Sequence, residues 1–238
     1  MKRALVVGGS SPIGQAISTE LASMGLHVFV HANRNLGQAQ ACVASITANG
    51  GSAEALQLDI ATPEAANRLE DLATSGAIQV VVYCVGGQID KPFAAMEFDD
   101  WKTVIDLNLT NFYTAVRPLI MPMLRSRWGR IIALSSLTAV RGNRGQTNYA
   151  AAKGGFLPLV KSLTQEYGSR GITANVVAPG LIDTAETTGL ENYQHLVKMT
   201  PARRAGTAEE VAALVGFLAS DRAGFISGQQ ISIDGGCS

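Results

Sequence analysis

Cysteine and histidine are both scarce in this chain of 238 residues, which holds three of each. Cys42, Cys84 and Cys237 form no CxxC motif, and no histidine lies near them at the spacing of a metal site. This scarcity excludes a disulfide scaffold and argues against a bound metal. We expect free thiols in a reducing cytoplasm.

Net charge and long apolar runs are missing as well. Nineteen basic residues balance nineteen acidic ones, so no global field attracts nucleic acid or an anionic membrane. The longest apolar runs, such as residues 80–85, fall far short of the roughly 18 residues of a membrane-spanning helix. The apolar run after Met1-Lys2-Arg3 leads into a glycine turn and is too short for a signal peptide. We therefore expect a cytoplasmic protein with no membrane or nucleic-acid partner.

Short β-branched runs alternate with longer amphipathic stretches along the whole chain, which has the 47% hydrophobic content of a soluble protein. This alternation indicates βαβ units, and right-handed crossovers then favour a doubly wound sheet. We predict an α/β fold: one Rossmann-like domain over residues 1–238, with a parallel seven-stranded sheet and helices on both faces. The predicted strands are residues 4–7, 28–31, 53–58, 80–84, 130–134, 173–178 and 230–233. The predicted helices are residues 13–24, 36–48, 63–75, 100–126, 149–167 and 208–219.

Residues 183–200 interrupt this pattern, because they are polar, weakly periodic and follow a Pro-Gly pair. We interpret them as a mobile flap over the substrate. A plain surface loop is the alternative.

A glycine-rich turn, Val-Gly-Gly-Ser-Ser-Pro-Ile-Gly, joins the first predicted strand to the first helix. Glycines there let backbone amides approach a pyrophosphate, and the helix N-terminus stabilises its charge. At the end of the second strand, an acidic residue would bind a ribose hydroxyl of NAD(H). Ala32 occupies that position here, and Arg34 follows two residues later. A guanidinium fits a 2′-phosphate, so the cofactor expected is NADP(H) and not NAD(H). The alternative is that Arg34 only decorates a loop.

Tyr149 and Lys153 stand four residues apart in Asn-Tyr-Ala-Ala-Ala-Lys. On a helix they share one face, and an ammonium beside a phenol lowers the pKa of the phenol. Such a tyrosine can donate a proton to a ketone oxygen during reduction. Ser136 ends the fifth predicted strand, where open α/β sheets bind ligands, and Asn108 lies inside a long helix. Ser135 is the neighbouring alternative, but the two-residue period of a strand places it on the opposite face.

These motifs resemble the short-chain dehydrogenase/reductase family along essentially the whole chain. Its Thr-Gly-xxx-Gly-x-Gly motif maps to Val7, Gly8, Pro12 and Gly14, so Val7 and Pro12 depart from it. Its Asn-Asn-Ala-Gly motif is replaced by residues 83–86, Tyr-Cys-Val-Gly, of which only the glycine persists. We expect the backbone turns to remain and the asparagine hydrogen bonds to be lost.

The resemblance implies a catalytic tetrad of Asn108, Ser136, Tyr149 and Lys153. Ser136 would stabilise the developing alkoxide and Tyr149 would supply the proton. Lys153 would also hold the ribose, and Asn108 would anchor a water that links Lys153 to solvent. Asp59 resembles the acid that contacts the adenine ring, with a helix-entry aspartate as the alternative. The predicted cofactor-binding residues are Gly8, Ser10, Ser11, Pro12, Ile13, Gly14, Asn33, Arg34, Asp59, Ile60, Gly86, Tyr149, Lys153, Pro179, Gly180, Ile182 and Thr184.

Three segments (Asn-Tyr-Ala-Ala-Ala-Lys, the run around Val-Ala-Pro-Gly, and the terminal Ile-Asp-Gly-Gly) look like bacterial 3-oxoacyl-[acyl carrier protein] reductases. In those enzymes an acidic carrier protein docks on arginines that match Arg127 and Arg170 here. The resemblance also implies a homotetramer. Open alternatives are a reductase of free sugars, steroids or quinones, a ketoreductase of polyketide or polyene synthesis, and a nucleotide-binding protein without turnover. The alternative for the two arginines is that they are cations at helix C-termini, where they stabilise the helix dipole.

Overall fold

The computed structural model describes residues 1–238 and contains one seven-stranded sheet in the order β3-β2-β1-β4-β5-β6-β7. Every neighbouring pair of strands is parallel. The strands are β1 (Arg3–Val7), β2 (His27–Ala32), β3 (Ser52–Gln57), β4 (Val80–Tyr83), β5 (Gly129–Leu134), β6 (Ile172–Pro179) and β7 (Gln230–Ile233). The order reverses between β1 and β4, and open sheets of this kind bind ligands at that crevice.

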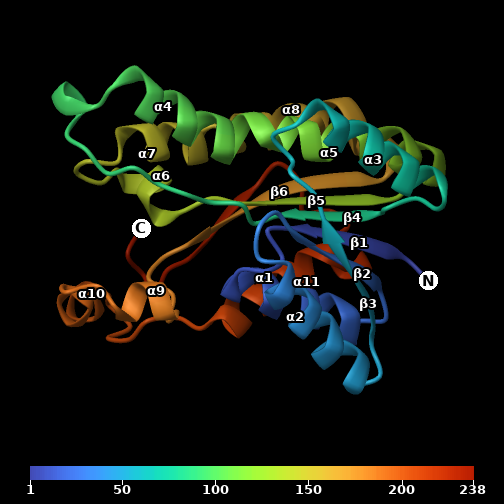
Figure 1. Ribbon diagram of the computed structural model, residues 1–238, viewed down its shortest axis with the longest axis horizontal. Coiled ribbons are helices and arrows are strands. Elements are labelled where there is room, and N and C mark those ends of the chain that lie inside the picture. Colours follow the sequence, from blue (N-terminus) through green and yellow to red (C-terminus); the bar gives the residue numbers. More distant parts are fainter.

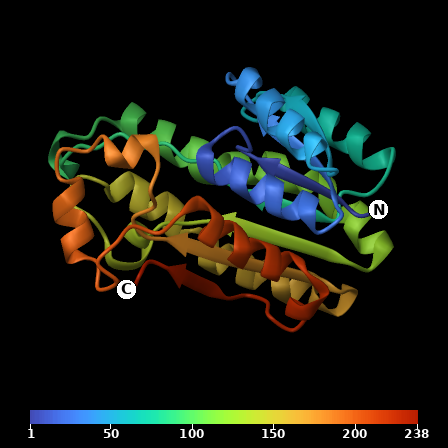
Figure 2. The same ribbon diagram turned by 90° about the horizontal axis from the view of Figure 1, so that it is seen from below.

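Helices cover both faces of the sheet, as Figures 1 and 2 show. One layer contains α1 (Pro12–Ser23), α2 (Leu36–Ala48) and α11 (Ala208–Ala219). The other contains α3 (Pro63–Thr74), α4 (Phe98–Ile105), α5 (Asn111–Ser126), α7 (Thr147–Gly154) and α8 (Phe156–Tyr167). Shorter elements are α6 (Leu137–Arg141), α9 (Ala185–Thr188), α10 (Tyr193–Met199) and single turns at Phe93–Ala95, Gly168–Arg170 and Asp221–Ala223.

The core consists of two apolar clusters, one between the sheet and each helical layer. Side chains of β1 alternate between them: Ala4 and Val6 face α1 and α11, while Leu5 and Val7 face α3 and α5. This is the period of two that a pleated strand imposes, and burial on both faces is typical of a parallel sheet. The doubly wound α/β prediction is therefore confirmed.

Two predicted helices differ from the structure in their interior. Residues 100–126 do not form one regular helix, because a π-helical turn, η2 (Asp106–Thr110), separates α4 from α5. Residues 149–167 are divided at Gly155, where an added Cβ would lie 2.9 Å from Leu109 Cδ2. The glycine lets the break between α7 and α8 approach η2 closely, so the two irregularities meet.

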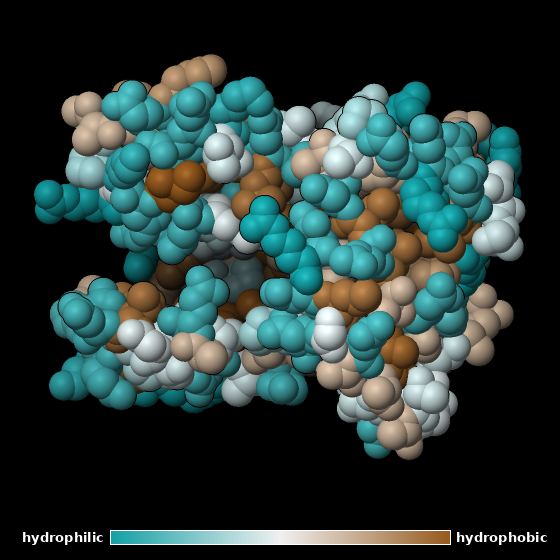
Figure 3. All heavy atoms as spheres, in the orientation of Figure 1, coloured by the Kyte–Doolittle hydropathy of each residue, from teal (hydrophilic) through white to brown (hydrophobic).

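The carboxyl ends of the strands open into a hollow on the left of Figure 3, between the α4 and α7 region and the α9 and α10 region. The loops that leave β4, β5 and β6 all lead to this end (Figure 1). No helix in the structure combines the length and the apolarity that crossing a membrane requires.

Candidate active site

The turn after β1 packs so tightly that three of its positions require glycine. Gly8 has φ +81°, and an added Cβ there would lie 3.1 Å from the Cys84 carbonyl carbon. A Cβ on Gly9 would lie 2.9 Å from Val30, and one on Gly14 would collide with the carbonyl oxygen of Gly8. The glycines therefore hold the first turn of α1 directly against the ends of β1 and β4.

The N-terminus of α1 leaves one amide free. Ser11 caps the helix: its Oγ accepts from Gly14 N at 3.1 Å and donates to Gly8 O at 2.8 Å. Pro12 has no N–H, and Gln15 N donates to Ser11 O. Ile13 N–H therefore remains for an outside acceptor, at the positive end of a helix of twelve residues. A phosphate group fits this turn.

The predicted adenosine contacts lie at the ends of β2 and β3. Asn33 and Arg34 are exposed, and Arg34 takes part in none of the ion pairs of the chain. Asp59 Oδ1 accepts from Ala61 N at 3.0 Å, so it does support the entry to α3, while Ile60 is buried. The free guanidinium of Arg34 is available for an anionic group.

Tyr149 and Lys153 lie on consecutive turns of α7, with the Lys153 Nζ 5.8 Å from the centroid of the Tyr149 ring. Lys153 is only 2% exposed, and its Nζ donates to Val85 O at 2.8 Å and to Leu134 O at 2.9 Å. Burial lowers the pKa of Lys153 to about 8. The lysine is thus fixed between the ends of β4 and β5.

The expectation that Lys153 lowers the Tyr149 pKa is wrong for this structure. Burial raises that pKa above its usual value, a hydrogen bond with Ser136 lowers it part of the way, and the carboxylates of Glu186 and Asp90 raise it. The ammonium instead faces two backbone carbonyls. Tyr149 is therefore protonated at neutral pH, the state that a proton donor needs.

Ser136 lies at the end of β5, where its Oγ caps α6 by accepting from Thr138 N at 3.2 Å. Its interaction with Tyr149 places the two hydroxyls at one site. Ser135, the alternative, is buried and donates to the Lys153 carbonyl at 3.0 Å. The two hydroxyls thus have different partners, and of the two serines only Ser136 acts on Tyr149.

Asn108 is fully buried at the centre of η2. Its Nδ2 donates to Gly87 O and Val104 O, both at 2.8 Å. The bond to Val104, four residues back, competes with the backbone bond of a regular helix, which accounts for the π turn. Its Oδ1 accepts from Gly87 N at 3.4 Å. An added Cβ on Gly86 would lie 3.8 Å from this Oδ1 and 3.7 Å from Lys153 Nζ, so the amide and the ammonium border the same glycine.

The departures at positions 83 and 84 are accommodated. Tyr83 is fully buried, and its hydroxyl donates to Leu107 O in η2 at 2.9 Å. Its ring packs edge-on against Phe112 and Phe156. Tyr83 therefore ties β4 to the turn that carries Asn108, a link that the sequence did not predict. Cys84 lies near Lys153, and burial raises its pKa to about 12, so the thiol stays protonated.

The loop after β6 and the segment beyond it are held to the domain by backbone contacts where the segment begins and ends. Ile182 pairs with Gly206 in a short parallel bridge, and Asp183 N donates to Gly206 O at 2.8 Å. Thr184 caps α9. Gly180 packs against Asp234, where an added Cβ would lie 2.7 Å from the aspartate Cα. The chain thus leaves the domain at Ile182 and rejoins it at Gly206, and the intervening residues, which include 183–200, contain two short helices, α9 and α10.

A polar cluster beside the tetrad was missed from the sequence. Gln146 is buried, its Nε2 donates to both Asp90 oxygens at 3.1 and 3.0 Å, and its Oε1 accepts from Thr138 at 3.2 Å. Asn148 donates to Ile89 O at 3.1 Å and accepts from Tyr149 N at 2.7 Å. These bonds fix the first turn of α7 and therefore the position of Tyr149. No local pattern marks them, because the partners Asp90 and Ile89 lie 56 and 59 residues away in the sequence.

Arg127 and Arg170 lie together but at the other end of the sheet from Tyr149. Arg127 ends α5 before β5 begins, and its Nη2 donates to Ser169 O at 3.5 Å. Arg127 has φ 50°, a left-handed conformation that costs a non-glycine residue about 1–2 kcal/mol. The length of β5 separates this pair from Ser136 by roughly 20 Å at ~3.3 Å per residue.

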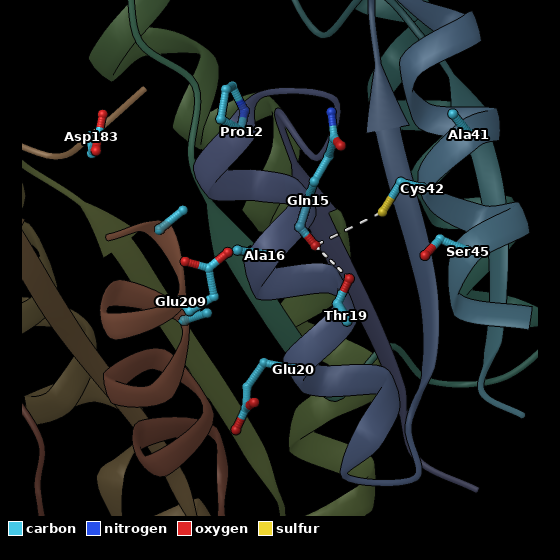
Figure 4. Close-up of a pocket in the computed structure, with 12 residues that line it drawn as sticks. Pro12, Gln15, Ala16, Thr19, Glu20, Ala41, Cys42, Ser45, Asp183 and Glu209 are labelled. Carbon is cyan, nitrogen blue, oxygen red and sulfur yellow. Dashed lines mark hydrogen bonds between the residues drawn. The ribbon is translucent and has the colours of Figure 1, made fainter. Parts of the chain in front are cut away.

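A groove of ≈ 580 Å³ runs along the outer side of α1, between α2 and α11 (Figure 4). Glu20, Glu209 and Asp183 contribute carboxylates to it, and no tetrad residue lines it. Its charge is unfavourable for a phosphate-bearing ligand. Pro12 is the one residue of the phosphate turn that lines the groove, and the tetrad lies at the carboxyl ends of the strands instead.

The sequence model of a protein family described as "Enoyl-(Acyl carrier protein) reductase", within the short-chain alcohol dehydrogenase group, matches residues 7–238. The chain belongs to the short-chain dehydrogenase/reductase family. Curated relatives in this family include 3-oxoacyl-[acyl-carrier-protein] reductases FabG. That of Pseudomonas aeruginosa is 41% identical, over 99% of this chain and 96% of its own. That of Aggregatibacter actinomycetemcomitans is 39% identical, over 98% and 97%. That of Escherichia coli is 39% identical, over 99% and 96%.

Proposed function

We propose that this short-chain dehydrogenase/reductase reduces a 3-oxoacyl thioester, carried by acyl carrier protein, to the 3-hydroxyacyl thioester with NADPH. The observation that carries the proposal is the similarity to 3-oxoacyl-[acyl-carrier-protein] reductases over 98–99% of this chain. The positions of Ser136, Tyr149 and Lys153 at the carboxyl ends of β4 and β5 support it.

The residues of the site divide the chemistry between them. NADPH, when bound, supplies the hydride. The Ser136 hydroxyl donates to the substrate oxygen and stabilises negative charge as it develops there. Tyr149, held protonated by burial, gives its proton to that oxygen. Lys153, held by the carbonyls of Val85 and Leu134, would bind the ribose of the cofactor. Asn108 Oδ1 borders the same glycine as the Lys153 ammonium, and we assign it to the route by which a proton returns.

The family description and the names of the relatives point to two different reductions. Enoyl reduction places the proton on a carbon atom, whereas 3-oxoacyl reduction places it on an oxygen. The paired hydroxyls of Ser136 and Tyr149 suit an oxygen, because both can hydrogen-bond to it before transfer. We therefore favour the 3-oxoacyl reduction.

A substrate panel tests this choice. NADPH oxidation is followed with an acetoacetyl thioester, a crotonyl thioester, a sugar ketone and a quinone. We expect turnover with the acetoacetyl thioester at least about tenfold above each of the others, as differential transition-state binding requires. A preference for the free ketones would favour a reductase of small carbonyl compounds. The absence of any turnover would favour a non-catalytic nucleotide-binding protein.

Arg34 selects NADPH over NADH in our proposal. Replacing it with alanine removes charge-assisted hydrogen bonds to the 2′-phosphate, so we expect the KM for NADPH to rise roughly tenfold or more. The KM for NADH, which lacks that phosphate, serves as the internal control and should stay constant. An unchanged KM for NADPH in Arg34→Ala would show that Arg34 is a loop residue that does not bind the 2′-phosphate.

We propose that the carrier protein docks on Arg127 and Arg170. The strained backbone of Arg127 is consistent with a side chain retained for a function. Because the pair lies a strand length from Ser136, the active site served belongs to a second copy, packed antiparallel along α5 and α8. Tyr113 and Met121, which are exposed apolar residues on α5, suit such a contact. The full assembly is a homotetramer, completed through β7.

Arg127→Glu tests the docking site. Charge reversal should lower kcat/KM for an acyl-carrier substrate by at least about tenfold and leave a small thioester analogue unaffected, because only the carrier needs the positive patch. Arg68→Glu, on the exposed side of α3, changes the net charge equally and should affect neither substrate. Equal losses of kcat/KM on both substrates with Arg127→Glu would contradict the proposal that the carrier protein docks there.

The remaining expectations belong to the same proposal. Residues 1–238 form one domain, and residues 183–200 act as a flap that closes over the acyl chain, with its base held at the Ile182–Gly206 bridge. The enzyme works in the cytoplasm, where its three free cysteines are compatible with a reducing environment. Fatty-acid synthesis is the pathway that the relatives favour, and polyketide synthesis is the alternative.

A further inference from the structure

His31 is a buried histidine that connects three strand ends at the phosphate turn. It lies near the end of β2 and is 3% exposed. Its Nδ1 accepts from Gly8 N at 3.0 Å, and its Nε2 lies 2.8 Å from Leu58 O. Gly8 follows β1 directly, and Leu58 follows β3. The ring therefore ties the first glycine of the turn to both neighbouring strands.

The two partners determine the protonation state of the ring. Gly8 N–H can only donate, so Nδ1 carries no proton, and the Leu58 carbonyl can only accept, so Nε2 carries one. A proton on Nδ1 would face the amide hydrogen of Gly8 and remove its acceptor. The turn has its observed hydrogen bonds only while His31 is neutral.

The backbone of the two residues after Gly8 also contacts the backbone of His31. Ser10 N donates to the His31 carbonyl at 3.3 Å, and an added Cβ on Gly9 would lie 3.2 Å from His31 N. A shift of His31 therefore moves the residues that precede the α1 N-terminus. That terminus holds the free Ile13 amide, which we assign to phosphate.

We propose that His31 is a positioning residue for the phosphate turn and that its protonation weakens nucleotide binding in acid. The proposal rests on the assignment of NADP(H) to this site. Asp59, after β3, is the charged side chain that acts on the ring, while β1 and β3 otherwise present backbone groups. Burial lowers the pKa of His31 below its ordinary value, and the Leu58 bond and Asp59 oppose this. Affinity is therefore full at neutral pH and falls as the pH drops through that lowered pKa.

The test is the Kd of NADP⁺, which is stable in acid, measured by calorimetry between about pH 5 and 8. His31→Asn keeps an oxygen acceptor for Gly8 N–H but cannot titrate. His31→Leu removes the acceptor. As the pH falls across this range, we expect the Kd of the wild type to rise about tenfold more than the Kd of His31→Asn. We expect His31→Leu to bind NADP⁺ about tenfold more weakly than the wild type even at neutral pH. The nucleotide's own phosphate titrates equally in every sample and cancels in the comparison.

Matched controls are His27→Asn, on the same strand, and His195→Asn, on α10, because these are the other two histidines of the chain. Both should follow the wild-type curve. Parallel curves for wild type and His31→Asn would overturn the role of His31 and leave the proposed cofactor intact. No NADP⁺ binding by the wild type at neutral pH would instead overturn the cofactor assignment. If His31→Leu does not fold, the comparison with His31→Asn decides alone, and the ¹⁵N shifts of the wild-type ring show whether Nδ1 is unprotonated.

Discussion

Tyr149→Phe should lower kcat at least about a hundredfold, because loss of a general acid typically costs two to four orders of magnitude. The substitution removes one oxygen atom and keeps the ring beside Lys153. Binding of NADPH should change little, so the loss should appear in kcat and not in the Kd of the nucleotide. Stopped-flow and steady-state NADPH oxidation with an acetoacetyl thioester provide the measurement.

Tyr167→Phe provides the matched control for this experiment. Tyr167 ends α8, away from the tetrad of its own subunit, and its partly buried ring packs against the core. The same loss of a hydroxyl there should leave kcat within about twofold of wild type, because the ring and its packing are retained. Turnover by Tyr149→Phe close to that of Tyr167→Phe would contradict the assignment of Tyr149 as the proton donor.

Gly14→Ala should disrupt the phosphate turn. The new Cβ would collide with the Gly8 carbonyl oxygen and lie 2.8 Å from the Gly9 Cα, and both neighbours are backbone atoms that cannot rotate away. We expect a loss of about 1–3 kcal/mol in the free energy of unfolding, the usual range for overpacking. Affinity for NADP⁺ should fall roughly tenfold or more, because the helix N-terminus is displaced from the phosphate.

Gly37→Ala is the matched substitution, since Gly37 also lies in the first turn of a helix but an added Cβ there meets nothing within 4 Å. It should stabilise the chain by up to about 0.5–1 kcal/mol and leave nucleotide affinity unchanged. Chemical denaturation and calorimetry measure the two quantities. Equal affinities of the two variants for NADP⁺ would show that the turn does not bind the phosphate.

The sheet was predictable because most strands, such as β1, β4 and β5, are short apolar runs between turn residues. Every predicted strand overlaps an observed one, and the helix bounds Leu36–Ala48 and Ala208–Ala219 agree with the prediction at both ends. Periodicity could not reveal the π turn, because it depends on where one side chain, Asn108, is bonded: to Val104 four residues back and to Gly87, which only the fold brings near. Boundaries set by local pattern were thus accessible, and those set by distant contacts were not.

The candidate site followed the same rule. The i, i+4 geometry of Tyr149 and Lys153 and the direction of Ser136 follow from helix and strand periods. The direction of the Tyr149 pKa shift could not be predicted in this way, because burial, Ser136 and the carboxylates of Glu186 and Asp90 together determine it. His31 and Tyr83 carry no motif, and their roles depend on backbone groups of Gly8 and Leu107 that only the fold brings near.

The most direct test of the proposed reaction uses NADPH deuterated at the transferable position, with an acetoacetyl thioester on the acyl carrier protein and mass analysis of the product. The proposed mechanism predicts a 3-hydroxybutanoyl thioester with one deuterium on C3 and the solvent proton on oxygen, formed by the wild type and at least about a hundredfold more slowly by Tyr149→Phe. Recovery of the unreduced 3-oxo thioester, under conditions in which the wild type binds NADPH, would contradict the proposed function.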